Sequence, residues 1–313
     1  MEKTSNVTVF IFLGLSQNPE VEEVCFVVFS FFYMASLLGN LLITLTAHMG
    51  NLLKSPMYFF LNYLSFVDIC YSSVIAPKMI VDLLAKRKTI SYPGCMLQLF
   101  GAHFFGSTEV FILILMAYDR YVAICKPLHY LTIMDQDRCN KMLLGTWVGG
   151  FLHSVIEMAL VVQLPFCGPN EIDHYFCDVH PVLKLACTDT YVVGIVVTAN
   201  SGTIALGSFV TLLISYSVIL LFLRKQSAEG RRKALSTCSS HIAVVVMFFG
   251  PCTFMYMRSD VTFAADKMVA VFYTIITPML NPLIYTLRNA EVKNAMKILW
   301  YKKLGDFSLF NLG

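Results

Sequence analysis

Long stretches without charged residues dominate the chain. Asp, Glu, Lys and Arg are all absent from four windows: Val24–Ala47, Thr190–Leu223, Ala234–Met257 and Met268–Leu287. Each window reaches the roughly 20 apolar residues that a helix needs to cross a bilayer. Because a spanning segment must satisfy its own backbone hydrogen bonds, these windows predict transmembrane helices.

Three further apolar runs are each interrupted by a single carboxylate: Pro56–Pro77 by Asp68, Ser91–Tyr118 by Glu109, and Met142–Asn170 by Glu157. Together, the four windows and three runs predict an all-α membrane protein, a bundle of seven transmembrane helices. We expect one domain, with an N-terminal segment over 1–23, the bundle over 24–287 and a tail over 288–313. In the tail, apolar residues such as Val292 and Met296 share a face among lysines, which predicts a short amphipathic helix on anionic lipid.

Composition and charge agree with a membrane protein and set its orientation. Hydrophobic residues make up 57% of the 313 residues and charged residues 14%, which excludes an ordinary soluble domain. Fifteen of the 23 Lys and Arg residues are Arg120 and those in the loops near 48–55, 126–141 and 224–233 and in the tail, so that side is expected to be cytoplasmic. The N-terminus is then outside, where Asn6 begins the chain's one glycosylation sequon. The net charge of +3 is explained by this topology, and no nucleic-acid partner is expected.

An acid and a base end the third apolar run, in "MAYDRYVAIC". Charge inside a membrane costs about 2.5–3.5 kcal/mol on insertion scales and usually marks function. The Asp119–Arg120 pair has two explanations. Arg120 is either an interface anchor that reaches lipid phosphate or part of a functional switch.

Four cysteines lie in or beside the loops expected outside: Cys95, Cys167, Cys177 and Cys187. Disulfides form in that compartment, but four cysteines allow three connectivities and spacing does not choose among them. His174 and His180 lie among these cysteines, so a zinc or copper site is the alternative to disulfides.

Several motifs resemble one family. The Asp119–Tyr121 triplet, Asn40, Asp68, Cys95, Trp147 and "NPLIY" (Asn281–Tyr285) are similar to landmarks of rhodopsin-like G-protein-coupled receptors. "PMYFFLNYLSFVDICYSS", "MAYDRYVAICKPLHY", "KALSTCSSH" and "PMLNPLIYTLRN" resemble an olfactory receptor of the tetrapod-type class. "AHFFGSTEVF" and "FFGPCTFMYMR" resemble its family 4.

The resemblance implies a receptor that binds small volatile odorants, activates the olfactory type of stimulatory G protein and raises cyclic AMP. It implies a multi-pass protein in the plasma membrane of sensory cilia, with no enzymatic activity. It also implies the disulfides Cys95–Cys177 and Cys167–Cys187. A rhodopsin-like receptor for another small molecule or a lipid is the alternative, and a transporter is a more distant one because the chain lacks internal repeats.

The ligand site is expected among the helices near their outer ends. Helical spacing from Cys95 and Arg120 turns five residues of the third helix inward: Ala102, His103, Gly106, Ser107 and Val110. By resemblance, residues of the fifth, sixth and seventh helices join them: Asn200, Ser201, Ile204, Phe249, Cys252, Thr253, Tyr256, Val271 and Thr274. We expect His103 to be the main polar contact, because its imidazole can donate or accept a hydrogen bond and can coordinate a metal ion that also binds a thiol.

The resemblance also implies a switch at the cytoplasmic end. There Asp119 restrains Arg120 at rest, Tyr216 and Tyr285 hold the open state, and Lys233 and His241 act in gating. The other switch residues are Tyr121, Asn281 and Pro282.

Buried carboxylates are the remaining chemistry. Asp68 and Glu109 are expected to be neighbours, neutralised by a sodium ion between them or by a shared proton. His153 and Glu157 stack four residues apart on one helix face. They either neutralise each other or add Glu157 to the ligand site.

Overall fold

The computed structural model describes residues 7–256, 263–288, 293–294 and 296–297. Its first half contains β1 (Val9–Phe12), α1 (Pro19–Met49), η1 (Leu52–Lys54), α2 (Pro56–Leu84), β2 (Thr89–Ser91), α3 (Tyr92–Cys125), η2 (Pro127–His129), α4 (Tyr130–Ile133) and α5 (Gln136–Val162). The second half contains β3 (Glu171–Ile172), α6 (Val179–Leu183), α7 (Tyr191–Leu223), α8 (Ala228–Tyr256), α9 (Phe263–Val271), the π-helical turn η3 (Phe272–Ile276) and α10 (Thr277–Arg288).

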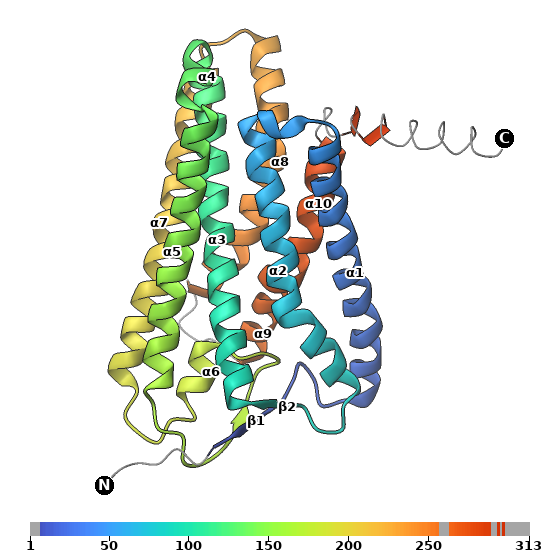
Figure 1. Ribbon diagram of the computed structural model, residues 1–313, viewed down its shortest axis with the longest axis vertical. Helices are drawn as coiled ribbons and strands as arrows, with labels where there is room; N and C mark the ends of the chain where they lie inside the picture. The colour runs from blue at the N-terminus through green and yellow to red at the C-terminus, as the bar shows by residue number, and fades with distance from the viewer. Residues whose placement is uncertain (1–6, 257–262, 289–292, 295, 298–313) are drawn as a thin grey trace, which may run out of the picture.

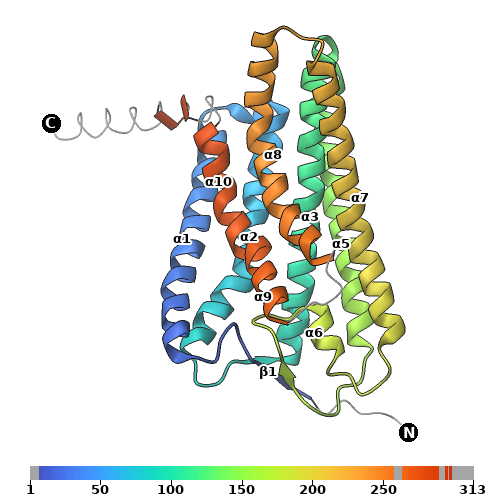
Figure 2. The same ribbon diagram turned by 180° about the vertical axis from the view of Figure 1, so that it is seen from behind.

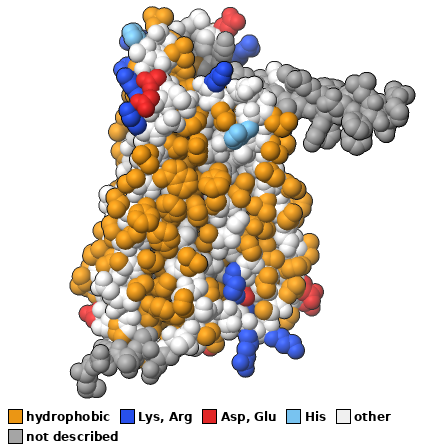
Figure 3. All heavy atoms as spheres, in the orientation of Figure 1, with side chains coloured by type: hydrophobic (Ala, Val, Ile, Leu, Met, Phe, Trp, Pro, Cys, Tyr) orange, Lys and Arg blue, Asp and Glu red, His pale blue; other side chains and the backbone are white. Residues whose placement is uncertain are grey.

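The long helices run side by side as a bundle (Figures 1 and 2). One end, called the sheet end below, carries the three short strands and α6. The other end carries α4 and the loop between α7 and α8, and is called the Arg120 end. Hydrophobic side chains cover the middle of the visible face, and the charged side chains gather toward its two ends (Figure 3). This is the surface expected of a bundle surrounded by lipid.

The predicted spans correspond to helices of the bundle. Among the described residues, six segments are long and apolar enough to cross a membrane: α1, α2, α3, α5, α7 and the stretch Lys267–Tyr285. The predicted sixth span is α8, whose described part includes the apolar stretch His241–Gly250. The all-α, seven-helix class predicted from the sequence is confirmed.

Several helix ends differ from the apolar windows, and two of them have a clear local cause. The first helix begins at Pro19 rather than at Val24, because the Asn18 side chain accepts a hydrogen bond from the Glu20 amide at 3.0 Å and caps the helix. The fourth apolar run continues to Asn170, but α5 ends at Val162. The residues that follow include Pro165 and Gly168, which do not continue a helix although they keep the run free of charge.

A three-stranded sheet with the order β2-β1-β3 covers the sheet end of the bundle. β1 pairs antiparallel to β2, with Phe10 opposite Ile90, and parallel to β3, with Ile11 opposite Glu171. No strand was predicted for the N-terminal segment. Phe10 and Phe12 point away from solvent and join a buried apolar cluster with Cys95, Leu99, Phe166, Ile172 and Cys177. The N-terminal segment is therefore part of the folded core.

Close packing joins the first and last helices. The amide of Asn40 on α1 donates to the Pro278 carbonyl of α10 at 2.9 Å. A Cβ atom added to Gly39 would lie 2.9 Å from the Pro282 ring, so this helix contact depends on glycine. The contact holds α10 where Asn281 can reach the carboxylates at the centre of the bundle.

Candidate functional site

A cavity of about 490 Å³ lies between the helices near the sheet end. Helices α2, α3, α5, α7 and α8, the α9–η3 segment and the chain from β3 through α6 all contribute to its wall. Its lining residues are Tyr71, Ala102, His103, Gly106, Ser107, Val110, His153, His174, Phe176, Asp178, His180, Pro181, Lys184, Ser201, Ile204, Ala205, Phe248, Phe249, Val269 and Tyr273. Its volume lies within the range of cavities that hold small organic ligands.

Part of the expected ligand site lines this cavity. All five inward residues of α3 are there, with two from α7 and one from α8: Ala102, His103, Gly106, Ser107, Val110, Ser201, Ile204 and Phe249. The five on α3 recur at helical spacing, so one face of that helix forms the wall.

Three expected residues lie outside the lining. Asn200 turns toward α5 instead of into the cavity. Val271 packs in a buried apolar cluster, and the Thr274 hydroxyl bonds to the Tyr175 hydroxyl at 3.1 Å. In the seventh span, Val269 and Tyr273 line the cavity in their place. The side chains of Cys252, Thr253 and Tyr256 lie outside the described part of the chain.

The loop between α5 and α7 forms a further wall of the cavity, although none of its residues was predicted to contact ligand. It contributes His174, Phe176, Asp178, His180, Pro181 and Lys184. Cys177 is bonded to Cys95 on α3, and its amide donates to the Gln98 side chain at 2.9 Å. These two bonds draw the loop across the end of the bundle. The cysteine pairing implied by the resemblance was the signal that could have placed Phe176 and Asp178 here.

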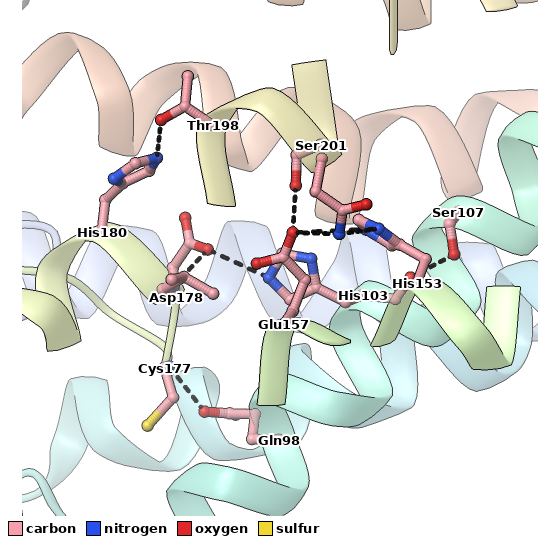
Figure 4. A network of polar contacts seen from close by, with 12 residues as sticks. Gln98, His103, Ser107, His153, Glu157, Cys177, Asp178, His180, Thr198 and Ser201 are labelled. Carbon is pink, nitrogen blue, oxygen red and sulfur yellow. Dashed lines mark hydrogen bonds and ion pairs between the residues drawn. The ribbon is translucent and has the colours of Figure 1, made fainter. Parts of the chain in front are cut away.

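A polar network crosses one side of the cavity (Figure 4). His103 Nε2 on α3 lies 3.7 Å from Asp178 Oδ1 of the loop. On α7, the Asn200 amide donates to His153 Nδ1 at 2.9 Å and to Glu157 Oε1 at 2.8 Å. The first contact ties α3 to the loop, and the others tie α5 to α7. The rings of His103 and His153, with centroids 5.5 Å apart, bring the two sets together.

Glu157 is fully buried behind the cavity wall and is not among the lining residues. Its Oε1 lies 4.0 Å from His153 Nδ1, and it accepts hydrogen bonds from Asn200 and, at 3.0 Å, from the Ser201 hydroxyl. The two residues share a helix face, as the spacing predicted. They interact mainly through the Asn200 amide rather than by direct pairing.

Burial and neighbouring groups shift the pKa values of Asp178 and His174 in the loop, and so set their charges. Burial raises the pKa of the Asp178 carboxyl, but His103, His174 and the Val179 amide outweigh it and hold that pKa well below its usual range. Burial lowers the pKa of His174 to about 4. The loop therefore presents an ionised carboxylate and a neutral imidazole at neutral pH.

The Asp119–Arg120 pair lies at the opposite end. Arg120 Nε donates to Asp119 Oδ2 at 2.9 Å, and Asp119 is fully buried. The Tyr130 hydroxyl donates to the other carboxylate oxygen at 2.7 Å, a contact that was not predicted from the sequence. The carboxylate thus holds the guanidinium on one side and α4 on the other.

Other residues of the expected switch lie around this pair. The Tyr216 hydroxyl on α7 is hydrogen-bonded to His241 Nδ1 on α8, and His241 is fully buried. Tyr121 packs with Tyr216 and Cys238, while Pro282 and Tyr285 are buried on α10. The Lys233 side chain lies outside the described residues.

Two carboxyl groups meet at the centre of the bundle. Asp68 and Glu109 are both fully buried, and the Asn281 amide donates to Asp68 Oδ2 at 2.8 Å. Among the described residues, Asp68 Oδ1, both Glu109 oxygens and Asn281 Oδ1 have no hydrogen-bond partner. Several oxygen atoms with unused lone pairs therefore gather here.

The loop cysteines form two disulfides, Cys95–Cys177 and Cys167–Cys187, the pairing that the resemblance implies. No group of three or more His, Cys, Asp or Glu side chains within the described part of the chain is arranged to hold a metal ion. Asn6, the expected glycosylation site, lies outside the described residues.

Comparison with known proteins identifies the family. Residues 29–303 match the family model described as olfactory receptor. The chain is 84% identical to human olfactory receptor 4S2 over 300 residues, covering 96% of each protein. It is 61% identical to human olfactory receptor 4B1 over 97% of this chain and 98% of that protein. Mouse olfactory receptor 4B13 is 59% identical over 97% of this chain and 99% of its own length.

These matches extend along nearly the whole chain, and they include every span of the bundle. Proteins of this family are odorant receptors that couple to G proteins, and they are not enzymes. The chain belongs to the olfactory receptor family, as a multi-pass protein of the plasma membrane.

Proposed function

We propose that odorants bind in the cavity near the sheet end and that the bound receptor activates a stimulatory G protein of the olfactory type, raising cyclic AMP. The observation that carries the proposal is the cavity itself: apolar walls from α3, α7 and α8 with a few histidines, on the residues expected to contact ligand. Such walls suit a small, rather hydrophobic molecule.

The sheet end would face the outside and the Arg120 end the cytoplasm, in the membrane of sensory cilia. Two features support this orientation. The disulfides Cys95–Cys177 and Cys167–Cys187 are at the sheet end and need an oxidising compartment. Lysines and arginines concentrate in the loops and tail of the other end, as the positive-inside rule requires.

Signalling would pass through the Asp119–Arg120 pair. At rest, Asp119 neutralises Arg120, and the Tyr216–His241 contact joins α7 to α8 close to it. Outward movement of α8 would separate His241 from Tyr216 and free Arg120 to meet the G protein. The ligand shifts this equilibrium only by binding the open form more tightly than the resting form.

Asp68 and Glu109 would hold a sodium ion that stabilises the resting form. Two carboxylates removed from water cannot both stay ionised unaided, and hard cations prefer oxygen ligands. The oxygens without partners on Asp68, Glu109 and Asn281 fit such an ion. A proton shared between the carboxyl groups is the alternative.

Thermal unfolding of the purified receptor distinguishes the two. Sodium should raise the unfolding temperature more than potassium does, and Glu109→Gln should remove that difference. Equal effects of the two ions on the wild-type receptor would exclude the sodium site and leave the shared proton.

A cyclic-AMP screen tests the main proposal. Cells that carry the receptor and the olfactory stimulatory G protein should respond to members of a chemically broad odorant panel. The panel should also contain lipids, because a lipid-only response would favour the alternative ligand class. A receptor that reaches the cell surface and raises cyclic AMP with no panel member would contradict the proposal.

A further inference from the structure

Two imidazole rings meet at the wall of the cavity (Figure 4). His103 comes from α3 and His153 from α5, and both line the cavity. Their ring centroids are 5.5 Å apart, with the ring planes at 62°. An oxygen that is hydrogen-bonded to an imidazole nitrogen lies about 4 Å from the centroid of that ring. Because the two centroids are only 5.5 Å apart, one ligand oxygen can lie at this distance from both rings.

The Asn200 amide fixes the proton of His153. Its nitrogen donates to Glu157 Oε1 and to His153 Nδ1, so Nδ1 is an acceptor and carries no proton. The Ser201 hydroxyl also donates to Glu157, which keeps the carboxylate in the acceptor role. A neutral imidazole with an unprotonated Nδ1 carries its proton on Nε2. His153 therefore presents an N–H donor through Nε2.

Asp178 favours the tautomer of His103 that offers an acceptor to the ligand, where His153 offers a donor. The Asp178 carboxylate lies 3.7 Å from His103 Nε2, and its negative charge favours the tautomer of His103 that carries the proton on that nitrogen. In the neutral ring, Nδ1 is then an acceptor. With these tautomers, His153 offers one hydrogen-bond donor to a ligand and His103 offers one acceptor.

The hydroxyl groups of two serines in the wall are already committed as donors. Ser107 donates to the His103 carbonyl at 2.6 Å, and Ser201 donates to Glu157. The imidazole pair is a place in the wall where one ligand group can both accept and donate a hydrogen bond. Apolar side chains such as Val110, Phe248 and Phe249 surround the space for the rest of the ligand.

We propose that the cavity selects odorants that carry a hydroxyl group, either an aliphatic alcohol or a phenol. The hydroxyl oxygen accepts a hydrogen bond from His153 Nε2, and the hydroxyl donates a hydrogen bond to His103 Nδ1. This inference rests on the proposed function, because it assumes that the cavity is the odorant site. An alcohol satisfies both rings, whereas an aldehyde or an ether only accepts and leaves His103 without a partner. A site built to hydrogen-bond a hydroxyl discriminates strongly against analogues that lack it.

The test compares probes that share a carbon skeleton. The aliphatic set is n-octanol, n-octanal and n-octane, and the aromatic set is para-cresol and its methyl ether. Affinity is measured with the purified full-length receptor in lipid nanodiscs, from the concentration dependence of its thermal stabilisation. We expect n-octanol and para-cresol to bind at least about tenfold more tightly than the other members of their sets.

Variants assign the preference to the two rings. His103→Phe and His153→Phe keep the aromatic volume and should reduce the alcohol preference to near unity. His48→Phe is the control, because His48 lies on α1 outside the cavity lining and its ring is hydrogen-bonded to the Thr44 carbonyl at 2.8 Å. The control should keep the preference. His103→Gln, which retains an acceptor, should keep part of it and serves if His103→Phe does not fold.

The outcomes separate this inference from the proposed function. Aldehyde or ether binding as tight as alcohol binding would overturn the hydroxyl selectivity while leaving odorant reception intact. A preference that survives both phenylalanine variants, or a receptor stabilised by none of the probes, would overturn it too. Binding with the expected preference but without cyclic-AMP output in cells would contradict only the coupling.

Discussion

Single residues decide which molecules fit the cavity. Ser107 lines it on α3, and its hydroxyl is bonded back to the helix, so the side chain contributes mainly its small size. Ser107→Val should fill part of the space and weaken the larger odorants by about tenfold relative to smaller ones, since one methylene in an apolar site is worth 10–200-fold. Dose–response curves over a graded odorant series measure this change.

Lys86→Ala is the control for Ser107, because Lys86 is exposed beyond the end of α2. Lys88 is less suitable, since it pairs with Glu22 of α1. An equal loss of potency for every odorant in the Ser107→Val receptor would show that Ser107 does not shape the cavity.

His174 makes the stability of the receptor depend on pH. Its ring stacks on Tyr175 and is buried, which lowers its pKa from 6.5 to about 4. The unfolded chain therefore takes up a proton near pH 6.5, whereas the folded protein does so only near pH 4. Stability from this residue is present above pH 6.5 and is lost as the pH falls toward 4, by about 3 kcal/mol at most.

His174→Phe keeps an aromatic ring and removes the titration. Thermal unfolding between pH 7 and 4 should show a shallower decline for this variant than for the wild type. Identical pH profiles would mean that the acid sensitivity comes from other groups.

At the scale of elements, the strand β1 connects the N-terminal segment to the bundle. Phe10 is fully buried and meets the Phe166 ring edge-on, with centroids 5.6 Å apart. Phe10→Ala should lower the free energy of unfolding by about 3–5 kcal/mol, the usual cost of removing a buried aromatic ring. Thermal unfolding of the purified receptor and its amount at the cell surface both report the loss.

The neighbouring residue Val9 is 40% exposed in the same strand and provides the matched control. Val9→Ala should change stability little. A Phe10→Ala receptor as stable as the Val9→Ala receptor would mean that the strand is not part of the stabilising core.

The helices could be predicted from the sequence because absence of charge is a local property. The sheet could not, because its strands are two to four residues long and pair across the chain, Ile11 with Glu171 for example. The same holds for the end of α5, where the residues after Val162 stay uncharged although they leave the helix. Local patterns specify an element only when it is long and periodic.

The cavity was predictable on its helical walls and not on its loop wall. Helical spacing put Ala102, His103 and Ser107 on one inward face, and all three line the cavity, since one α-helix fixes their common face. Asp178 reaches the cavity only through the Cys95–Cys177 bond and the path of a long loop, which periodicity does not describe. Thr274 was expected to face the ligand, but it lies in the π-helical turn η3, and its hydroxyl is hydrogen-bonded to the Tyr175 hydroxyl of the loop.

For the whole molecule, the central claim is that odorant binding near the sheet end reaches a G protein through Arg120. The cavity residue His103 and the Asp119–Arg120 pair lie on the same helix, α3. Replacement of Arg120 should therefore leave the cavity intact while removing the group that the G protein meets.

The most direct test is the cyclic-AMP response of an Arg120→Ala receptor to an odorant that activates the wild type. Surface expression and odorant binding, followed by thermal stabilisation, should stay measurable, and the cyclic-AMP response should be abolished. Undiminished cyclic-AMP output from a well-expressed Arg120→Ala receptor would contradict the account, and the pair would then be only an anchor at the membrane interface.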